Sequence, residues 1–368
     1  MLVASPLHQI LDLARWAPSG DNTQPWRFES VDELRFVIHG RDTRGDTVYD
    51  LDGRASQLSL GTLIETLSIA ATGHGLTLKV TRRADMPDDH PTFDAELKHW
   101  PSMTPSPLRH AIARRSVQRR PLKTTRLTED ELQALRESVG AEHELLVYQS
   151  WIERKRWAAM LWANAGLRLR LPEAFEVHRR VIQWDARYSA DRIPDQALGV
   201  AAPTIAMMRL AMTSWKRVEF LNTWLAGTIA PRIEMDLVPA LACAGHVAIL
   251  ARRPPQSIDD HVAAGRAVQR FWLTATALGL QHQPALTPLV FARFLRDGRT
   301  FTAHAPSVLA ARRVAGQLDE LLAGQSARCV WLGRIGHGPA ALARSVRKPL
   351  QALMVVASEP AVAPTPAR

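Results

Sequence analysis

The sequence predicts an α+β fold with much helix, organised as two related halves. Amphipathic helix patterns open both halves, short apolar segments of strand character follow them, and one helical segment occurs twice. With 368 residues, the chain is long enough for one large domain or two ordinary ones. Its hydrophobic fraction of 46% and charged fraction of 22% are typical of a soluble globular protein.

Each half opens with a predicted amphipathic helix. The helix over residues 7–17 places these residues on one apolar face: Leu7, Ile10, Leu11 and Ala14. The helix over residues 127–139 does the same with Leu132, Leu135 and Val139. Thr128 and Glu131 have the spacing of a capping box, in which the threonine caps the helix and the glutamate reaches back.

Four short segments then have the length and β-branched content of strands: residues 34–40, 143–149, 243–251 and 328–335.

A repeat supports the two halves. The stretches GTLIETLSIAATGHGL from Gly61 and GRAVQRFWLTATALGL from Gly265 align without gaps. The identical positions are Gly61/Gly265, Ala71/Ala275, Thr72/Thr276, Gly75/Gly279 and Leu76/Leu280. Both stretches predict buried helices, each ended by a glycine in the left-handed conformation. A chance match between two alanine-rich helices stays open as the alternative.

Composition suggests where the halves meet. Residues 86–107 are rich in proline and polar residues, which is typical of a surface connection, and we place the junction near Pro105. The expected units are residues 1–105, residues 106–357 with a Trp/Arg-rich helical insertion over about 151–231, and a disordered tail over 358–368.

Several classes of protein are disfavoured. No secretory signal is found, and the longest apolar run is shorter than the roughly 20 residues of a membrane helix, so we expect a cytoplasmic protein without a membrane partner. Cys243 and Cys329 predict buried, inert thiols. The 13 histidines show no metal-ligand spacing, so we expect no metal.

The formal charge of +10 favours an anionic partner, and basic residues are densest over residues 109–126. A solvated basic turn would be the ordinary interpretation of that cluster. It lacks interleaved aromatic residues, so we expect no nucleic acid partner.

Specific strings resemble one family. Residues 17–29, APSGDNTQPWRFE, resemble the APSxxNxQPWRF motif of FMN-dependent nitroreductases. Residues 109–118, RHAIARRSVQ, resemble the family motif IxxRRSxR, which holds the FMN phosphate. The helix from Gly265 is similar to the late central helix of the family, which precedes a segment against the isoalloxazine ring. Residues 331–350 resemble the last strand and the basic segment that closes on the phosphate.

The two principal motifs are divided between the halves. The first half has PSGDNTQPW and no RRS, whereas the second has RRS and, where PSxxN is expected, WIERKRWAAMLWANAGL. In the family, the phosphate motif of one subunit works with the PSxxN loop of the other. The resemblance therefore implies an intrachain pseudo-dimer with a single composite FMN site, similar to the tandem nitroreductase-like proteins of the Acg type.

The resemblance also implies the residues of the site. Guanidinium groups and a hydroxyl group suit a phosphate, short residues let a loop approach the flavin, and backbone amides beyond Pro284 lie near flavin N5. The candidate cofactor-binding residues are Pro18, Ser19, Gly20, Asn22, Arg114, Arg115, Ser116, Gln118, Pro284, Ala285, Leu286, Thr287, Arg344, Arg347 and Lys348. Thr287 stands where the family often has glycine, and Gln118 where it has a basic residue. No catalytic side chain is expected, because flavin N5 carries the chemistry.

The function implied is an FMN-dependent oxidoreductase that uses NAD(P)H to reduce a small-molecule electron acceptor in a ping-pong cycle. The alternative is a protein that stores or sequesters FMN without turnover. Two interpretations of residues 151–231 remain, namely helices that cover the core with aromatic anchors and a lid over the flavin. A monomer and a homodimer are both compatible with the sequence.

Overall fold

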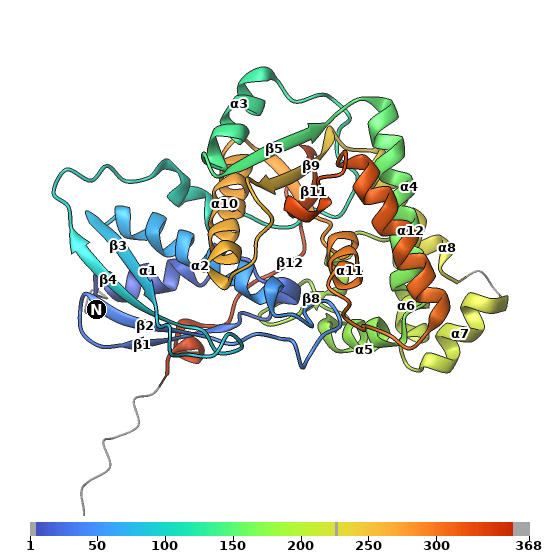
Figure 1. The fold of residues 1–368 in the computed structure, drawn as a ribbon, viewed down its shortest axis with the longest axis horizontal. Coiled ribbons are helices and arrows are strands. Elements are labelled where there is room, and N and C mark those ends of the chain that lie inside the picture. The colour runs from blue at the N-terminus through green and yellow to red at the C-terminus, as the bar shows by residue number, and fades with distance from the viewer. Residues whose placement is uncertain (1–4, 225–226, 356–368) are drawn as a thin grey trace, which may run out of the picture.

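Two four-stranded antiparallel sheets form the framework of the protein. The structure, a computed structural model, describes residues 5–224 and 227–355 (Figure 1). The first sheet has the order β1-β2-β4-β3, with β1 (Trp26–Ser30), β2 (Arg35–Gly40), β3 (Leu76–Arg82) and β4 (Thr92–His99). The second has the order β10-β11-β9-β5, with β5 (His143–Tyr148), β9 (Gly245–Ala251), β10 (Leu280–Pro284) and β11 (Cys329–His337). All four predicted strands are confirmed, as β2, β5, β9 and β11.

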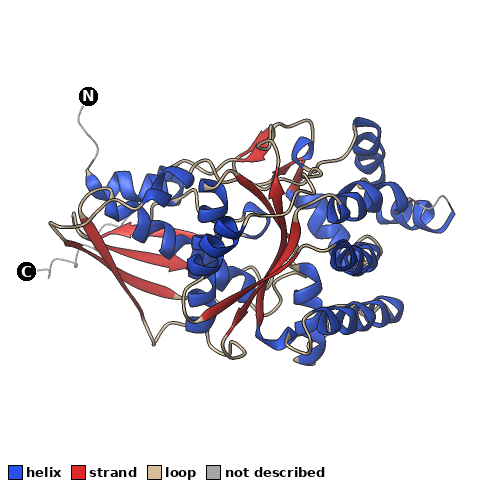
Figure 2. Ribbon diagram, turned by 90° about the horizontal axis from the view of Figure 1, so that it is seen from above, coloured by secondary structure: helices blue, strands red, loops and turns tan. Residues whose placement is uncertain are grey.

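Helices cover these sheets (Figure 2). Helices α1 (Pro6–Ala14) and α2 (Arg54–Thr72) pack on the first sheet. Helices α3 (Glu129–Ser138) and α10 (Ile258–Ala277) cover one face of the second sheet. Its other face carries α4 (Trp151–Arg168), α11 (Thr287–Arg296) and α12 (Ala305–Leu321). The mixed helix and sheet fold predicted from the sequence is confirmed.

The two opening helices form as predicted. The four predicted apolar residues of α1 are all buried. At the start of α3, the Thr128 hydroxyl accepts from the Glu131 amide at 3.2 Å, and the Glu131 carboxylate accepts from the Thr128 amide at 2.8 Å. This is the predicted capping box.

The repeated segments lie in the middle of the molecule, where α2 and α10 cross. Gly61 and Gly265 face each other there: a Cβ on Gly61 would lie 2.8 Å from the Gly265 Cα, and one on Gly265 would lie 2.9 Å from the Gly61 Cα. Gly75 and Gly279 have φ of 67° and 76°, the predicted left-handed conformation. Both glycines are followed at once by strands, β3 and β10.

The prediction for residues 86–107 is wrong. Residues 86–107 are not simply a surface connection, because β4 lies inside this range and is hydrogen-bonded to strands on both sides. Phe93, Ala95 and Leu97 alternate along β4 and are buried in the core of the first sheet. This period of two was masked by the prolines that flank it. Pro105 lies between β4 and the short helical turn over Pro107–Ala111.

The Trp/Arg-rich segment is mostly helical. After α4 it forms α5 (Pro172–Val181), α6 (Ala202–Ala211), α7 (Trp215–Trp224) and α8 (Ile229–Arg232), and α9 (Val238–Leu241) follows. Short strands β6 (Ile182–Gln183), β7 (Tyr188–Ser189) and β8 (Ile193–Pro194) lie between α5 and α6, and β7 pairs with β12 (Arg344–Ser345) near the end of the chain. Trp157 is a buried anchor, whereas Trp151 and Trp224 are exposed.

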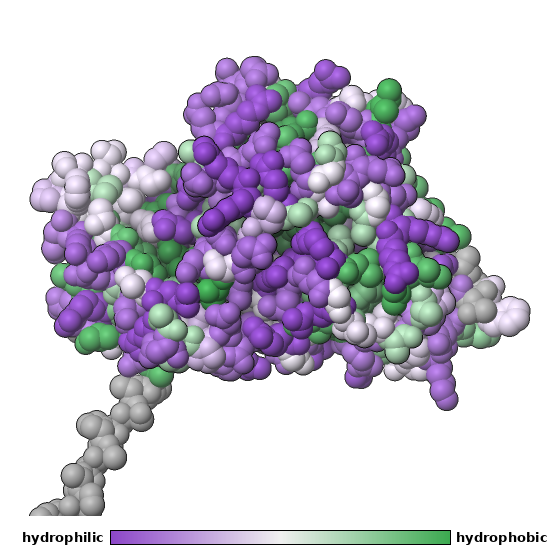
Figure 3. Space-filling view, viewed as in Figure 1, coloured by the Kyte–Doolittle hydropathy of each residue, from purple (hydrophilic) through white to green (hydrophobic). Residues whose placement is uncertain are grey.

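Other predictions concern the surface and the thiols. Hydrophilic residues cover most of the face in Figure 3, with apolar patches between them. Cys243 and Cys329 are free and buried as predicted, and burial raises the pKa of these thiols to about 11 and about 12. The predicted disordered tail over 358–368 lies outside the described residues.

Candidate functional site

The loop after α1 carries the first candidate residues. Pro18 is buried, and its carbonyl accepts from the Thr62 hydroxyl of α2 at 2.8 Å. The Ser19 hydroxyl accepts from the backbone amide of Gln24 at 2.9 Å, which closes the loop on itself. The loop is strained, because Asp21, Asn22 and Gln24 have φ of 48°, 63° and 51°, in the left-handed region that favours glycine. Gly20 is exposed at its tip.

Two side chains of this loop bind the segments that contain β7 and β12. The Asn22 amide donates to the Val346 carbonyl at 3.1 Å and to the Arg192 carbonyl at 3.4 Å. The side-chain amide of Gln24 donates to the Ala190 carbonyl at 2.9 Å. Asn22 is thus engaged by protein groups, although its buried side-chain oxygen accepts no hydrogen bond in the described part of the chain.

Three arginines converge next to this loop, and we call Arg115, Arg344 and Arg347 the arginine cluster. Arg347 donates from Nε to the Ala17 carbonyl at 3.0 Å, and Arg115 donates from Nη2 to the Trp16 carbonyl at 3.3 Å. Arg344 donates to the Arg115 carbonyl at 3.2 Å. The cluster therefore joins the segment before α3, the end of the chain and the residues directly before Pro18.

The cluster carries positive charge without an acidic partner. Among residues 5–224 and 227–355, no carboxylate forms an ion pair with any of the three. Burial, reinforced by the neighbouring arginines, lowers the pKa of Arg115 well below its ordinary value and that of Arg347 to about 9. Nε of Arg115 and Nε of Arg344 are buried without an acceptor. An anion at this place would accept from these donors and would stabilise the charged forms of the arginines.

Aromatic faces shape the cluster. The Arg115 guanidinium lies 4.4 Å from the ring centre of Trp272 in α10, and that of Arg344 lies 5.1 Å from the ring of Trp16. Such contacts hold guanidinium planes in fixed orientations. Neither ring was predicted from the sequence to belong to the site, although Trp16 directly precedes the motif that begins at Ala17.

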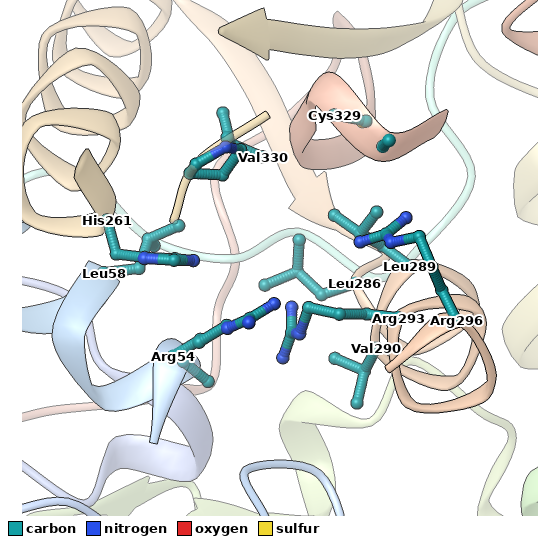
Figure 4. Close-up of a pocket in the computed structure, with 13 residues that line it drawn as sticks. Arg54, Leu58, His261, Leu286, Leu289, Val290, Arg293, Arg296, Cys329 and Val330 are labelled. Atoms are coloured by element: carbon teal, nitrogen blue, oxygen red, sulfur yellow. The ribbon is translucent and has the colours of Figure 1, made fainter. Parts of the chain in front are cut away.

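A small pocket elsewhere in the protein also contains arginines, but these are paired with carboxylates (Figure 4). It has a volume of about 40 Å³, and its lining includes Arg54, Leu286 and Arg293. Arg293 forms a two-point ion pair with Asp52 at 2.6 and 3.0 Å, and Arg54 pairs with Asp297 at 3.0 Å. The arginines of this pocket are thus neutralised by carboxylates. Its volume suits little more than a water molecule.

The remaining candidates of the RRS motif differ in exposure. Arg114 is exposed and Ser116 is half-buried. Gln118 is buried, and its amide donates to the Pro339 carbonyl at 2.8 Å while its side-chain oxygen accepts from the Arg120 amide at 3.1 Å. Both ends of Gln118 are therefore used within the protein. Lys348 is half-buried, and its backbone amide donates to the Gln24 side chain at 3.0 Å.

The turn between β10 and α11 holds the last four candidates. Pro284 ends β10, and the Ala285 amide donates to the Leu332 carbonyl of β11 at 2.8 Å. Leu286 lines the small pocket of Figure 4. Thr287 begins α11, and its hydroxyl accepts from the Asn164 amide of α4 at 2.7 Å. The structure brings the loop of Ser19 and the arginine cluster together, and in its described part no hydrogen bond joins this turn to either.

Neither a metal centre nor a membrane-spanning helix is found among the described residues. No group of histidine, cysteine, aspartate and glutamate side chains there is arranged to hold a metal ion. None of the described helices combines the length and the apolar character needed to cross a membrane.

Comparisons with known proteins leave the family open. No family model matches the chain, and no curated protein matches it. Among solved structures, the chain is similar to the FMN-dependent nitroreductase NfnB from Mycobacterium smegmatis, which was solved in complex with NADPH. The identity is 14%, the match covers 68% of this chain and 97% of that chain, and the TM-score is 0.37. A similarity at this level assigns neither family nor function.

Proposed function

We propose that the protein binds FMN, with the phosphate of the cofactor held by the arginine cluster. The observation that carries this proposal is the cluster itself, in which Arg115, Arg344 and Arg347 are gathered and, among the described residues, pair with no carboxylate. Gathering like charges away from water is costly unless a counter-ion joins them. A dianionic phosphate matches the planar, forked donors of arginine.

The position of the cluster supports a flavin phosphate over a free anion. Arg115 and Arg347 donate to the carbonyls of Trp16 and Ala17, directly before the loop whose sequence resembles the flavin-contacting motif. The RRS motif and the C-terminal basic segment, far apart in the sequence, thus meet at the motif of the first half. We propose that Pro18, Ser19 and Gly20 position the ring system, and that Arg114, Ser116 and Lys348 lie at the edge of the phosphate site.

We further propose that the chain is an intrachain pseudo-dimer with one composite site. The two sheets, their central helices and the aligned glycines Gly61 and Gly265, which meet at the helix crossing, support this arrangement. Because Ser19 comes from one half and Arg115 from the other, a single chain would supply a whole site.

Bound FMN would supply hydride chemistry, and the activity we propose is reduction of a small-molecule acceptor at the expense of NAD(P)H. The protein's own part is to bind the phosphate, to orient the ring system through the loop, and to cover the site. The segment over 185–200 fits the covering role, because it bonds to Asn22 and Gln24.

The same bonds favour one alternative, storage of FMN without turnover. If the segment over 185–200 stays closed, a reductant has no access to the bound cofactor. Rapid mixing of the FMN-loaded protein with NADPH separates the two functions. Bleaching of the flavin spectrum indicates an oxidoreductase, and an unchanged spectrum indicates storage.

Binding of FMN to the purified full chain tests the main proposal. We expect about one FMN per chain, and we expect Arg115→Gln and Arg347→Gln each to weaken binding about 10- to 100-fold, the loss of a hydrogen-bonded charge pair. Arg312→Gln, at an exposed arginine of α12, is the matched control and should bind like wild type. A wild-type protein that takes up no FMN contradicts the proposal, as does equal binding by all four proteins.

A further inference from the structure

A cavity of about 390 Å³ opens beside the loop that follows α1. The loop contributes Gly20 and Asp21 to its wall, the segment between β2 and α2 contributes Tyr49, and α5 contributes Arg180. This volume lies within the range of about 300–1,000 Å³ that is usual for small-molecule sites. The cavity touches the proposed cofactor loop at residues other than those that approach the arginine cluster.

Most charged groups in the wall are already satisfied by protein partners. The Asp50 carboxylate accepts from the Ser56 hydroxyl at 2.6 Å and from the Thr43 hydroxyl at 2.8 Å. Arg180 donates to the Asp46 carbonyl, and the Asp46 carboxylate pairs with Arg41 at 3.3 Å. These contacts hold the wall together.

Asp21 differs from all of them. Within the described residues, its carboxyl group forms no hydrogen bond and no ion pair, and it faces the cavity. Its backbone is left-handed, with φ of 48° and ψ of 21°, a conformation that costs an aspartate about 1–3 kcal/mol. Such strain persists where the surrounding structure holds a residue in a particular place.

Charged groups surround Asp21 at longer range. Arg119 approaches from the segment before α3, Arg168 from α4 and Arg180 from α5. Arg168 is paired with Asp236 at 3.0 Å, and Arg119 donates to the Ala197 carbonyl at 3.1 Å.

Tyr49 completes these surroundings, with its hydroxyl 3.0 Å from His178 Nε2. Burial raises the pKa of Asp21 in spite of the three cations. The carboxyl group therefore keeps its proton over a wider range of pH than an exposed aspartate does.

We infer that Asp21 is a catalytic proton donor, which hydrogen-bonds an oxygen of a neutral acceptor in this cavity and protonates it during reduction. The inference rests on the proposed function for its source of hydride. It assigns to the cavity the acceptor, and to Asp21 the proton that the acceptor oxygen takes up there.

The reaction balances for an acceptor of the quinone class. Overall, a C–H bond of NAD(P)H breaks, and two electrons and a hydrogen pass as hydride to the acceptor, so NAD(P)H is oxidised and the quinone reduced. One quinone oxygen is left as an oxyanion. The O–H bond of Asp21 then breaks, its proton forms the second hydroxyl of the hydroquinone, and the Asp21 carboxylate regains a proton from water.

Binding without any reductant tests the inference independently of turnover. We would measure the binding of tetramethyl-1,4-benzoquinone to the full chain by equilibrium dialysis over a range of pH. Wild-type binding should weaken as pH rises and Asp21 ionises. Asp21→Asn should bind with no such pH dependence, because its amide still donates a hydrogen bond at every pH. Asp85→Asn, an exposed change on the surface, is the control and should keep the wild-type profile.

Steady-state reduction of the same quinone gives the second measurement. Asp21→Asn should lose about 100-fold or more in kcat, the usual contribution of a general acid, because an amide cannot give up a proton. Asp21→Gly, which suits the left-handed backbone, should lose both binding and turnover.

Wild-type binding that does not change with pH would overturn the inference, as would an Asp21→Asn protein with normal kcat. Failure of the proposed function looks different, because it appears as absence of FMN uptake in the wild-type protein.

Discussion

The crossing of α2 and α10 makes a quantitative prediction for Gly265→Ala. A Cβ at this position would lie 2.9 Å from the Gly61 Cα, and the carbonyl oxygen of Leu58 would be closer still. Ordinary carbon contacts need about 3.5 Å, so the helices would have to separate by at least about 0.6 Å. The obstructing atoms belong to the backbone of a buried helix, so no side-chain rotation relieves the contact.

The magnitude follows from two opposing effects. Overpacking of a core costs about 1–3 kcal/mol, and backbone obstruction places this case at the upper end. Replacing a helical glycine by alanine returns about 1 kcal/mol of helix propensity. We therefore expect Gly265→Ala to lower the free energy of unfolding by about 2 kcal/mol.

Urea denaturation followed by circular dichroism measures this loss, and Gly316→Ala supplies the control. Gly316 lies in α12, and a Cβ there meets nothing within 4 Å, so alanine should stabilise by about 1 kcal/mol. Gly61→Ala should resemble Gly265→Ala, and the double variant should lose less than the sum, because the first change already parts the helices. A Gly265→Ala protein as stable as wild type would refute the close contact of the two helices.

Three further outcomes are expected. Thr128→Ala should lower the free energy of unfolding by about 1 kcal/mol in urea titrations, because it removes the capping box with Glu131; no loss would show that the cap contributes nothing. Cys243 and Cys329 should resist iodoacetamide at pH 8 until the protein unfolds, because burial raises their pKa to about 11 and about 12; labelling of the native protein would contradict this. Burial raises the pKa of Asp21, so the folded state holds a proton that the unfolded state has lost above the ordinary value of 3.8. Wild-type stability from this group falls as pH rises, and Asp21→Asn should unfold at a higher temperature than wild type at pH 7, with the difference vanishing near pH 3.

Local signals in the sequence predicted the elements they govern. The buried face of α1, the capping box of α3 and the left-handed Gly75 and Gly279 each depend on residues only a few positions apart. The strand β4 was missed because its alternation is short and lies between prolines, which dominate the composition of that stretch.

The candidate site depends on contacts that no local pattern encodes. Arg115 and Arg347 were predicted to lie together from motif resemblance, and the structure brings them to the carbonyls of Trp16 and Ala17. The engagement of Asn22 by the segment near β7 joins residues far apart in the chain, so periodicity offers no sign of it. Asp21 was part of the motif string, yet it is distinguished only by the cavity that it lines and by a carboxyl group that, among the described residues, forms no hydrogen bond or ion pair.

The contacts on either side of the paired glycines also determine which helices can pair. Glu65 of α2 is buried and forms ion pairs with Arg266 and Arg270 of α10 at 2.7 and 3.2 Å. Counted from the aligned glycines, Thr62 and Thr66 hold the corresponding positions in α2. If two chains exchanged partners so that α2 met another α2, each Glu65 would be buried opposite threonines, at a cost of about 3–5 kcal/mol per unpaired charge. The crossing therefore favours association of α2 with the α10 of its own chain and disfavours domain-swapped association of two newly made chains.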